Sequence, residues 1–163
     1  MSPKFNADEI FAIAEQIERN GAAFYRKAAE LETAAACKTL FEELAQQETD
    51  HLATFIQLEK QLAAHADAGD PPEIDETTAG YLNAMAGGYV FDTSEAPAET
   101  LDGSETLVQI VKLAIHKEED SIALYVGMRD ALSRPEDKEK LGAILQEEKK
   151  HLVDLASQIG LIG

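Results

Sequence analysis

Residues 46–52 read QQETDHL and residues 146–152 read QEEKKHL, and the likeness between them organises the rest of the chain. Each stretch places a histidine three residues after a glutamate: Glu48 and His51 in the first, Glu148 and His151 in the second. Residues three apart lie on the same face of an α-helix, one turn from each other. If both stretches are helical, each one presents a carboxylate and an imidazole together.

The same shift of one hundred residues relates other positions of the chain. It pairs Glu18 with Glu118 and Tyr25 with Tyr125. A lone Glu-x-x-His is a weak signal, since so short a motif also arises by chance. Two copies in one register, each with a glutamate thirty residues upstream and a tyrosine seven residues beyond that glutamate, are a strong signal. The chain is therefore interpreted as two repeats of one pattern.

Hydrophobic periodicity predicts an all-α protein. Apolar residues recur every three or four positions in four stretches, and no stretch alternates as a β-strand does. The predicted helices are residues 6–32, 34–65, 104–132 and 135–159. They form two helical hairpins, 6–65 and 104–160, joined by a crossover over 66–103 in which a short helix is predicted at 81–91. Short, long and short connections are typical of a ferritin-like four-helix bundle with one long crossover between the second and third helices.

Length, composition and charge limit what the protein can be. A chain of 163 residues, 45% of them apolar, predicts a single domain over residues 1–163. Its formal charge of −17 disfavours nucleic acid and membranes as partners and favours cations. A single cysteine, Cys37, excludes a disulfide framework and a Cys-x-x-Cys site. Since there is neither a signal-peptide pattern nor a long apolar segment, a cytoplasmic protein is expected.

Helical spacing places the repeated glutamates inside the bundle. Glu48 and His51 share a spacing of three and four residues with Phe41, Leu44 and Phe55, so they occupy core positions. The other three helices repeat this pattern, and each sends one glutamate into the core. A buried carboxylate without a partner is costly, and no basic residue lies on these faces. Two divalent cations balance four carboxylates, and two neutral imidazoles add one nitrogen ligand each.

One glutamate from each of two helices and Glu-x-x-His from each of the other two is the ligand pattern of ferritin-like proteins with a carboxylate-bridged pair of metal ions. The chain resembles the rubrerythrin-type branch of this family in particular. The resemblance rests on EQIERNGAAFY (15–25), EELAQQETDHL (42–52), IHKEEDSIALY (115–125) and LQEEKKHL (145–152). It covers both hairpins.

The resemblance implies two iron ions, with manganese or zinc as alternatives, held by six residues. The implied metal ligands are Glu18, Glu48, His51, Glu118, Glu148 and His151. Family behaviour implies that Glu48 and Glu148 bridge the two ions. It implies terminal roles for Glu18 and Glu118, and one histidine on each ion.

The tyrosines of the repeat have two possible roles. By resemblance, Tyr25 and Tyr125 lie beside the site and hydrogen-bond to its carboxylate ligands. Tyrosines on a helical core face are also common as simple packing residues, and this interpretation stays open. His51 and His151 could likewise be ordinary buried histidines bonded to carboxylates, although the doubled register argues against this.

Two departures from rubrerythrins bear on function. Full rubrerythrins add a rubredoxin-like domain with four cysteines, whereas this sequence has Cys37 alone. Electrons are therefore expected from an external donor such as a rubredoxin-like protein. Rubrerythrins also carry an additional glutamate on the third helix. The matching position here, three residues beyond Glu118, is Ser121, and its counterpart in the first repeat is Gly21. This departure argues against the peroxidase efficiency of a rubrerythrin.

Three functions are left open by the sequence. The first is a rubrerythrin-like di-iron peroxidase or oxidoreductase that reduces hydrogen peroxide or dioxygen. The second is ferrous-iron oxidation and iron handling, as in a ferroxidase. The third is a non-catalytic metal-binding helical bundle, because carboxylate and imidazole together accept several first-row metals. The resemblance also implies a homo-oligomer, a dimer or larger.

Overall fold

The computed structural model describes residues 7–32, 34–69, 73–92 and 101–162. All regular structure in these residues is helical. The helices are α1 (Ala7–Leu31), α2 (Ala35–Asp67), α3 (Glu76–Asp92), α5 (Leu107–Ala131) and α6 (Pro135–Ile162). The predicted all-α fold is confirmed, and the four long predicted helices are found with ends shifted by three residues or fewer.

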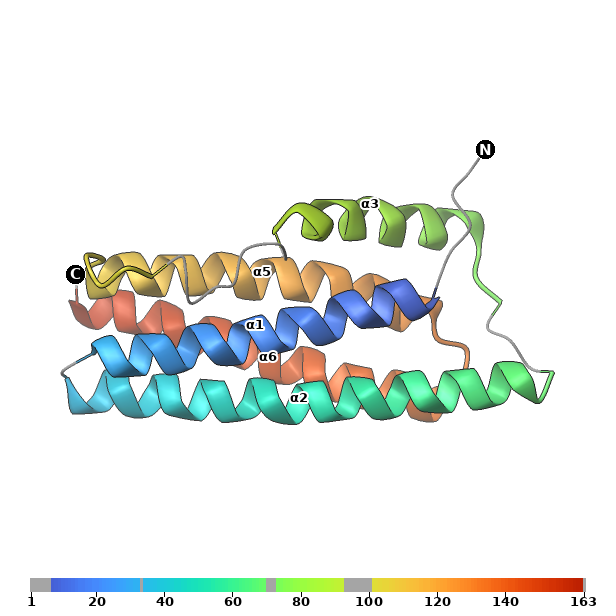
Figure 1. Ribbon diagram of the computed structural model, residues 1–163, viewed down its shortest axis with the longest axis horizontal. Helices are drawn as coiled ribbons and strands as arrows, with labels where there is room; N and C mark the ends of the chain where they lie inside the picture. The colour runs from blue at the N-terminus through green and yellow to red at the C-terminus, as the bar shows by residue number, and fades with distance from the viewer. Residues whose placement is uncertain (1–6, 33, 70–72, 93–100, 163) are drawn as a thin grey trace.

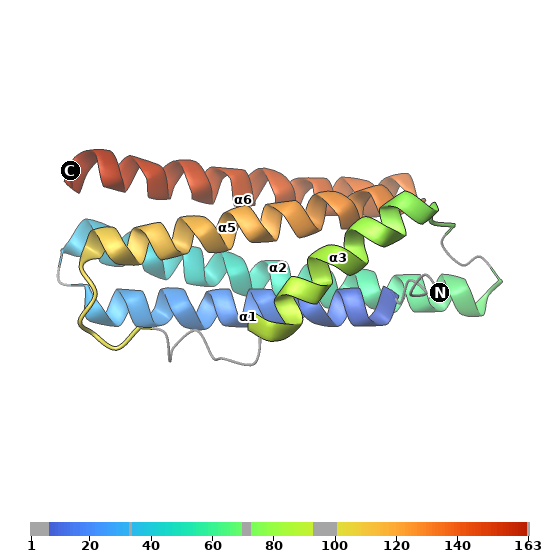
Figure 2. The same ribbon diagram turned by 90° about the horizontal axis from the view of Figure 1, so that it is seen from above.

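The four long helices lie side by side along the length of the molecule, and α3 crosses over α5 and α1 on one face (Figure 1, Figure 2). α1 packs mainly against α2, and α5 packs mainly against α6. α2 and α5 run in the same direction, and α3, which lies between them in the chain, runs back the opposite way (Figure 1). The predicted ferritin-like bundle with one long crossover is therefore the observed fold.

α3 is the helix of the crossover, and the predicted start at residue 81 was wrong. The helix begins at Glu76 because Asp75 caps it. The Asp75 carboxylate accepts hydrogen bonds from the Thr78 amide at 2.9 Å and from the Thr78 hydroxyl at 2.6 Å. Aspartate in this position satisfies amide groups that the first helical turn leaves without partners. The cap adds five residues to the predicted helix at its start.

The second hairpin also has well-defined helix starts. Thr106 and Gln109 form a capping box before α5: the Thr106 hydroxyl accepts from the Gln109 amide at 3.2 Å, and the Gln109 side chain accepts from the Thr106 amide at 2.8 Å. α6 begins with Pro135, whose missing N–H is not needed in the first turn. α5 therefore begins at Leu107, three residues after the predicted start.

Two apolar clusters fill the bundle, one on each side of a polar layer. Along each of the four long helices the chain passes from one cluster to the polar layer and then to the other cluster. The first cluster includes Phe11, Phe55, Leu124 and Leu141, and the second includes Phe24, Phe41, Val111 and Leu155. Burying each such side chain contributes about 1.5–3 kcal/mol. The two clusters therefore fix the backbone on both sides of the polar layer.

α3 docks on α5 through a close approach at Gly127. The Tyr81 hydroxyl donates a hydrogen bond to the Ala123 carbonyl oxygen at 2.6 Å. A Cβ added at Gly127 would lie 2.5 Å from two Tyr81 ring carbons and 3.0 Å from Leu82 Cδ2. Leu82 is fully buried, so it has little room to move. The bare backbone at Gly127 is what admits the Tyr81 ring.

Gly127→Ala is expected to destabilise the protein. Crowding costs about 1–3 kcal/mol, which exceeds the gain of about 1 kcal/mol that alanine brings to a helix interior. Gly142→Ala in α6 is the matched control, since nothing lies within 4 Å of the Cβ added there, and it is expected to stabilise. Urea unfolding measures both changes. Equal effects at the two positions would contradict this docking of α3.

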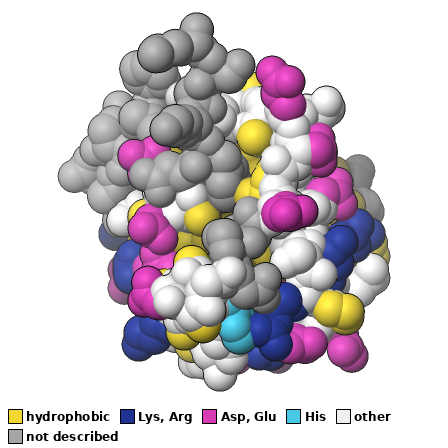
Figure 3. Space-filling view, turned by 90° about the vertical axis from the view of Figure 1, so that its right-hand side faces the viewer, with side chains coloured by type: hydrophobic (Ala, Val, Ile, Leu, Met, Phe, Trp, Pro, Cys, Tyr) yellow, Lys and Arg dark blue, Asp and Glu magenta, His cyan; other side chains and the backbone are white. Residues whose placement is uncertain are grey.

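The surface of the bundle carries both signs of charge. Figure 3 shows one end of the molecule, where acidic side chains in magenta stand among basic side chains in dark blue. Exposed ion pairs such as Lys150 with Asp154, at 2.8 Å, contribute little to stability because solvent screens them. Among the described residues, no helix is both long enough and apolar enough to cross a membrane.

Candidate metal centre

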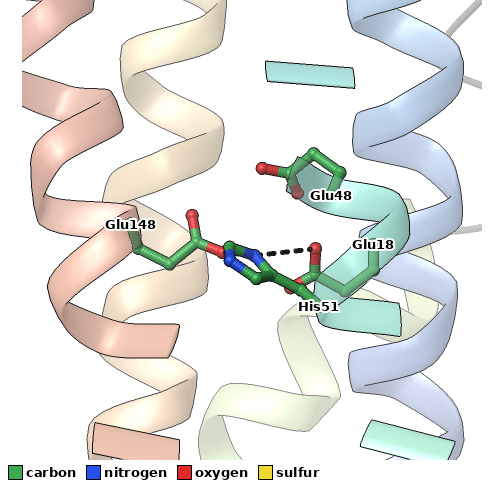
Figure 4. A group of neighbouring side chains, drawn as sticks. All are labelled: Glu18, Glu48, His51 and Glu148. Carbon is green, nitrogen blue, oxygen red and sulfur yellow. Dashed lines mark ion pairs between the residues drawn. The ribbon is translucent and has the colours of Figure 1, made fainter. Parts of the chain in front are cut away.

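The six predicted metal ligands come together in the polar layer between the apolar clusters. Each of the four long helices contributes one glutamate, and α2 and α6 each add a histidine. These buried residues are Glu18, Glu48, His51, Glu118, Glu148 and His151, none more than 4% exposed. Figure 4 shows four of them pointing toward one another from α1, α2 and α6. The helical spacing therefore predicted which side chains would share this layer.

The six residues form two overlapping groups whose ligand atoms lie within 4.8 Å of one another. The groups are Glu18, Glu48, His51 and Glu148, and Glu48, Glu118, Glu148 and His151. Glu48 and Glu148 belong to both groups, whereas each of the other four residues belongs to one. Each group offers three carboxylates and one imidazole.

The His51 ring points its two nitrogens in opposite directions. Nδ1 faces the interior, 2.9 Å from Glu148 Oε1 and 3.6 Å from Glu18 Oε2 (Figure 4). Nε2 faces outward and lies 2.6 Å from Glu147 Oε2. A carboxylate only accepts, so the Nε2–H donates to Glu147. His51 is thereby oriented to present Nδ1 to the cluster.

His151 has the same orientation on the other side of the cluster. Its Nδ1 lies 3.2 Å from Glu48 Oε1 and 3.6 Å from Glu118 Oε1. Its Nε2 lies 2.5 Å from the amide oxygen of Gln47, to which it donates. The His51 and His151 rings are stacked with centroids 5.6 Å apart. Glu147 and Gln47 were not among the predicted site residues.

The two tyrosines of the repeat reach across the bundle to glutamates of the opposite repeat. The Tyr125 hydroxyl donates to Glu18 Oε1 at 2.6 Å, and the Tyr25 hydroxyl donates to Glu118 Oε1. Both tyrosines are almost completely buried. Each therefore fixes the rotamer of one glutamate of the cluster, and Glu18 is left with its Oε2 facing His51 Nδ1 at 3.6 Å.

Several buried atoms of the cluster have no hydrogen-bond partner. They are Glu18 Oε2, Glu48 Oε1, both Oε atoms of Glu148, and Nδ1 of His51 and His151. Leaving a buried polar atom unpaired costs about 1–3 kcal/mol, and more when the group is charged. These atoms are oxygens and imidazole nitrogens that converge on one space, a donor set that suits divalent iron, manganese or zinc. The residues present therefore fit two divalent ions.

Gly21 makes room for one of the shared carboxylates. A Cβ at this position of α1 would lie 2.8 Å from Glu48 Oε2. The matching residue of the second repeat, Ser121, is buried, and its hydroxyl donates to the Lys117 carbonyl oxygen of its own helix at 2.9 Å. Neither position supplies a further carboxylate to the cluster.

Burial and mutual repulsion favour protonated carboxyl groups in the metal-free cluster. Burial, together with the charge of Glu148, raises the pKa of Glu18 well above its ordinary value. Burial and the charge of Glu18 do the same to the pKa of Glu48. Burial and Glu148 raise the pKa of Glu118 to about 8. Burial also acts to raise the pKa of Glu148, but it is lowered overall because Glu118 and both histidines lie against it.

The same carboxylates favour the charged form of both imidazoles. Burial lowers the pKa of His51, but the contact with Glu148 outweighs it and raises the pKa to about 9. Burial lowers the pKa of His151 as well, but Glu118 and Glu148 outweigh it and raise the pKa to about 12. Without a cation, shared protons therefore neutralise the cluster.

Loading the cluster with divalent ions at pH 7 is expected to release about three protons or more, because metal ligands bind in their deprotonated form. Glu118, His51 and His151, with pKa values of about 8, about 9 and about 12, hold protons at pH 7 in the metal-free protein. Protons compete more strongly as the pH falls, so affinity drops about tenfold per pH unit for each proton released. Titration calorimetry in two buffers of different ionisation enthalpy counts these protons. Equal heats in both buffers would rule out the release of protons on metal binding.

Comparison with known proteins supports the fold and the kind of site. No protein-family model matches the chain, and no curated protein matches it. Among solved structures, the chain is similar to a Thermotoga maritima protein described as a ferritin-like diiron-carboxylate protein. The two share 26% sequence identity and a TM-score of 0.66 over 91% of this chain and 90% of that one. The chain therefore has a ferritin-like fold with a buried cluster of carboxylates and histidines that fits di-iron binding. The comparison supports ferritin-like di-iron proteins in general and does not single out the rubrerythrin type.

Proposed function

We propose that the protein is a di-iron oxidoreductase that reduces hydrogen peroxide or dioxygen with electrons from an external donor. One observation carries the proposal: the two groups of buried ligand residues share Glu48 and Glu148. Two ions held by these groups would share Glu48 and Glu148 as ligands. Glu18 and His51 complete one position, and Glu118 and His151 complete the other.

The chemistry requires electrons that the side chains do not have. Ferrous ions held by the two ligand groups would supply the two electrons that, with two protons, convert one hydrogen peroxide into two water molecules. An external donor, such as a rubredoxin-like protein, returns two electrons after each turnover. The four buried carboxylates favour this role, because their charge stabilises the oxidised ions as well as the reduced ones.

The tyrosines keep the terminal carboxylates in position during this cycle. Burial and the charges of nearby glutamates raise the pKa of Tyr25 and Tyr125 well above the ordinary value. Both hydroxyls therefore keep their protons and continue to donate to Glu118 and Glu18. Their role in the proposal is to position ligands.

A groove offers a small oxidant a way to the edge of the site. It is open to solvent, has a volume of about 600 Å³, and runs between α2 and α6. Its lining includes His51, and also Glu147 and Gln47, which accept the outer hydrogen bonds of His51 and His151. Peroxide and dioxygen are small and uncharged, so the acidic protein does not repel them.

The test is reduction of peroxide by iron-loaded protein. Metal-free protein is loaded anaerobically with ferrous ions and mixed with hydrogen peroxide and reduced rubredoxin. We expect continuous peroxide consumption that needs both the protein and the donor, with two electrons used per peroxide. Zinc-loaded protein is the control, because zinc fills the same ligands without redox chemistry.

The same assay separates the proposal from iron handling. Iron-loaded protein that leaves both peroxide and dioxygen unreduced would overturn the proposal. Continued oxidation of added ferrous ions, well beyond two per chain and without need of a donor, would assign ferrous-iron oxidation instead. Either result leaves the di-metal site itself to be judged by the number of ions bound.

A further inference from the structure

The two repeats differ at the residue that supports each histidine. Position 47 is glutamine and position 147 is glutamate, although the ligands and tyrosines of the two repeats match one for one. Glu147 Oε2 lies 2.6 Å from His51 Nε2, and Gln47 Oε1 lies 2.5 Å from His151 Nε2. Each supporting residue thus serves the histidine of the other repeat. One imidazole donates to an anion and the other to a neutral amide.

This difference changes the strength of the inner nitrogen as a ligand. A hydrogen bond from the outer N–H of an imidazole to a carboxylate raises the basicity of the other ring nitrogen and stabilises its bond to a metal. Hydrogen bonds to charged acceptors are about twice as strong as those to neutral ones. The outer hydrogen bonds therefore favour His51 Nδ1 over His151 Nδ1 as a metal ligand. The higher pKa of His151 in the metal-free cluster arises from Glu118, Glu148 and Glu48, which would themselves bind the ions.

Neither solvent nor the nearby lysines cancel the effect of the Glu147 carboxylate on His51. The Glu147 side chain is 54% exposed in the groove, which weakens its field but leaves a short hydrogen bond to the buried His51. Lys140 and Lys150 line the same groove. Lys140 donates to Gln61 at 3.1 Å, and Lys150 pairs with Asp154 at 2.8 Å. Both lysines are thus engaged with residues other than Glu147.

We infer that Glu147 makes the metal position containing His51 the tighter of the two, so that the ions load in a fixed order with this position first. The inference rests on the proposed two-ion site and adds to it a positioning residue for each histidine. Gln47 leaves the position containing His151 as the weaker one. The two metal positions would therefore differ in affinity, although their ligand residues are of the same types.

The repeats themselves supply the test. Glu147→Gln gives both histidines an amide acceptor, Gln47→Glu gives both a carboxylate, and the double exchange transfers the asymmetry to the other side. Protein labelled with ¹⁵N-histidine is titrated with Zn²⁺, and the imidazole nitrogen signals report which histidine binds at each equivalent. Calorimetry gives the two affinities. Because both supporting side chains border the open groove, the substitutions are expected to leave the fold intact.

In the wild-type protein, the His51 signals are expected to shift with the first ion and the His151 signals with the second. Glu147→Gln is expected to weaken the first step about tenfold, and Gln47→Glu to strengthen the second step about tenfold. The double exchange is expected to reverse the order. Glu139→Gln removes an exposed charge elsewhere on α6 and is the control for net charge.

Two results would overturn the inference and are distinct from failure of the proposed function. One is simultaneous loading of His51 and His151 in the wild type, or loading of His151 first. The other is an order that the double exchange leaves unchanged. Both presuppose that two ions bind per chain. A wild-type protein that does not bind two ions overturns the two-ion site itself and the inference with it.

Discussion

Glu148→Gln is expected to weaken the binding of both divalent ions by at least about 100-fold, since losing only a supporting partner of a ligand costs about 10–100-fold. Both carboxylate oxygens of Glu148 are buried without a hydrogen-bond partner, and Glu148 belongs to both ligand groups. Glutamine keeps the shape but has no charge and only one acceptor oxygen. A single neutral oxygen cannot serve both metal positions as the carboxylate would, and both positions lose its negative charge.

Glu118→Gln is the matched comparison, because Glu118 belongs to one group only. Anaerobic ferrous titration of metal-free protein is expected to count two tight ions in the wild type, one in Glu118→Gln and none in Glu148→Gln. Both substitutions remove one buried carboxylate from the same layer, so a difference between them reports sharing of Glu148. A Glu148→Gln variant that retains one tight ion would falsify the bridging role.

The predicted ligand set came from two independent regularities in the chain. Helical spacing showed that Glu48 and His51 occupy core positions, and the shift of one hundred residues selected Glu148 and His151 as their counterparts. Such local patterns determine which face of a helix is buried. They were sufficient to place these side chains in one buried layer, because all four long helices point their buried faces at it; that these residues bind metal stays a prediction. The structure adds how the glutamates are divided between two groups, which depends on the distances between helices.

Glu147 and Gln47 were missed for a physical reason. A residue next to a ligand on a helix points about 100° away from it, so it is ordinarily assigned to a solvated face. Here α2 and α6 lie close enough for each such side chain to reach the histidine of the other helix. The periodicity of a single helix does not predict the distance between α2 and α6. The available signal was the mismatch between positions 47 and 147, in a repeat that preserves its six predicted ligand residues and its two tyrosines.

The start of α3 was missed because its signal is short. Asp75 and Thr78 form a cap that involves only four consecutive residues. Docking of Tyr81 over Gly127 depends on a helix distant in sequence. Apolar periodicity identified the long helices, but it is a weak predictor for a helix such as α3, which packs on the outside of the four-helix bundle.

Glu18→Gln is expected to stabilise the metal-free protein by about 1–3 kcal/mol, the range found when buried charges without adequate partners are removed. Glu18 is fully buried, its Oε2 has no hydrogen-bond partner, and burial with the charge of Glu148 raises its pKa. The glutamine oxygen can still accept the hydrogen bond from Tyr125, now 2.6 Å long. The substitution therefore removes the cost of protonating a buried carboxyl group on folding, with little change in packing.

The stabilisation depends on pH with a definite sign. A carboxyl group whose pKa is higher in the folded state than in the unfolded chain contributes most to stability at low pH, and this contribution is lost as the pH rises. Glu18 behaves in this way. Glutamine does not titrate. The advantage of Glu18→Gln over the wild type is therefore expected to grow between pH 5 and pH 8.

Metal loading is expected to reverse the ranking. An ion that binds only the folded protein adds about 4 kcal/mol when its concentration is a thousand times Kd, which raises Tm by about 8–16 °C for a chain of this size. Glu18→Gln loses a ligand of one metal position and forfeits much of this gain. Thermal unfolding with and without excess Zn²⁺ measures both states, and Glu139→Gln is the exposed control. If metal-free Glu18→Gln were less stable than the wild type, the Glu18 carboxylate would stabilise the fold without any metal. The expected reversal of the stability ranking on metal loading would instead mean that the buried glutamates are retained for binding cations at the expense of stability.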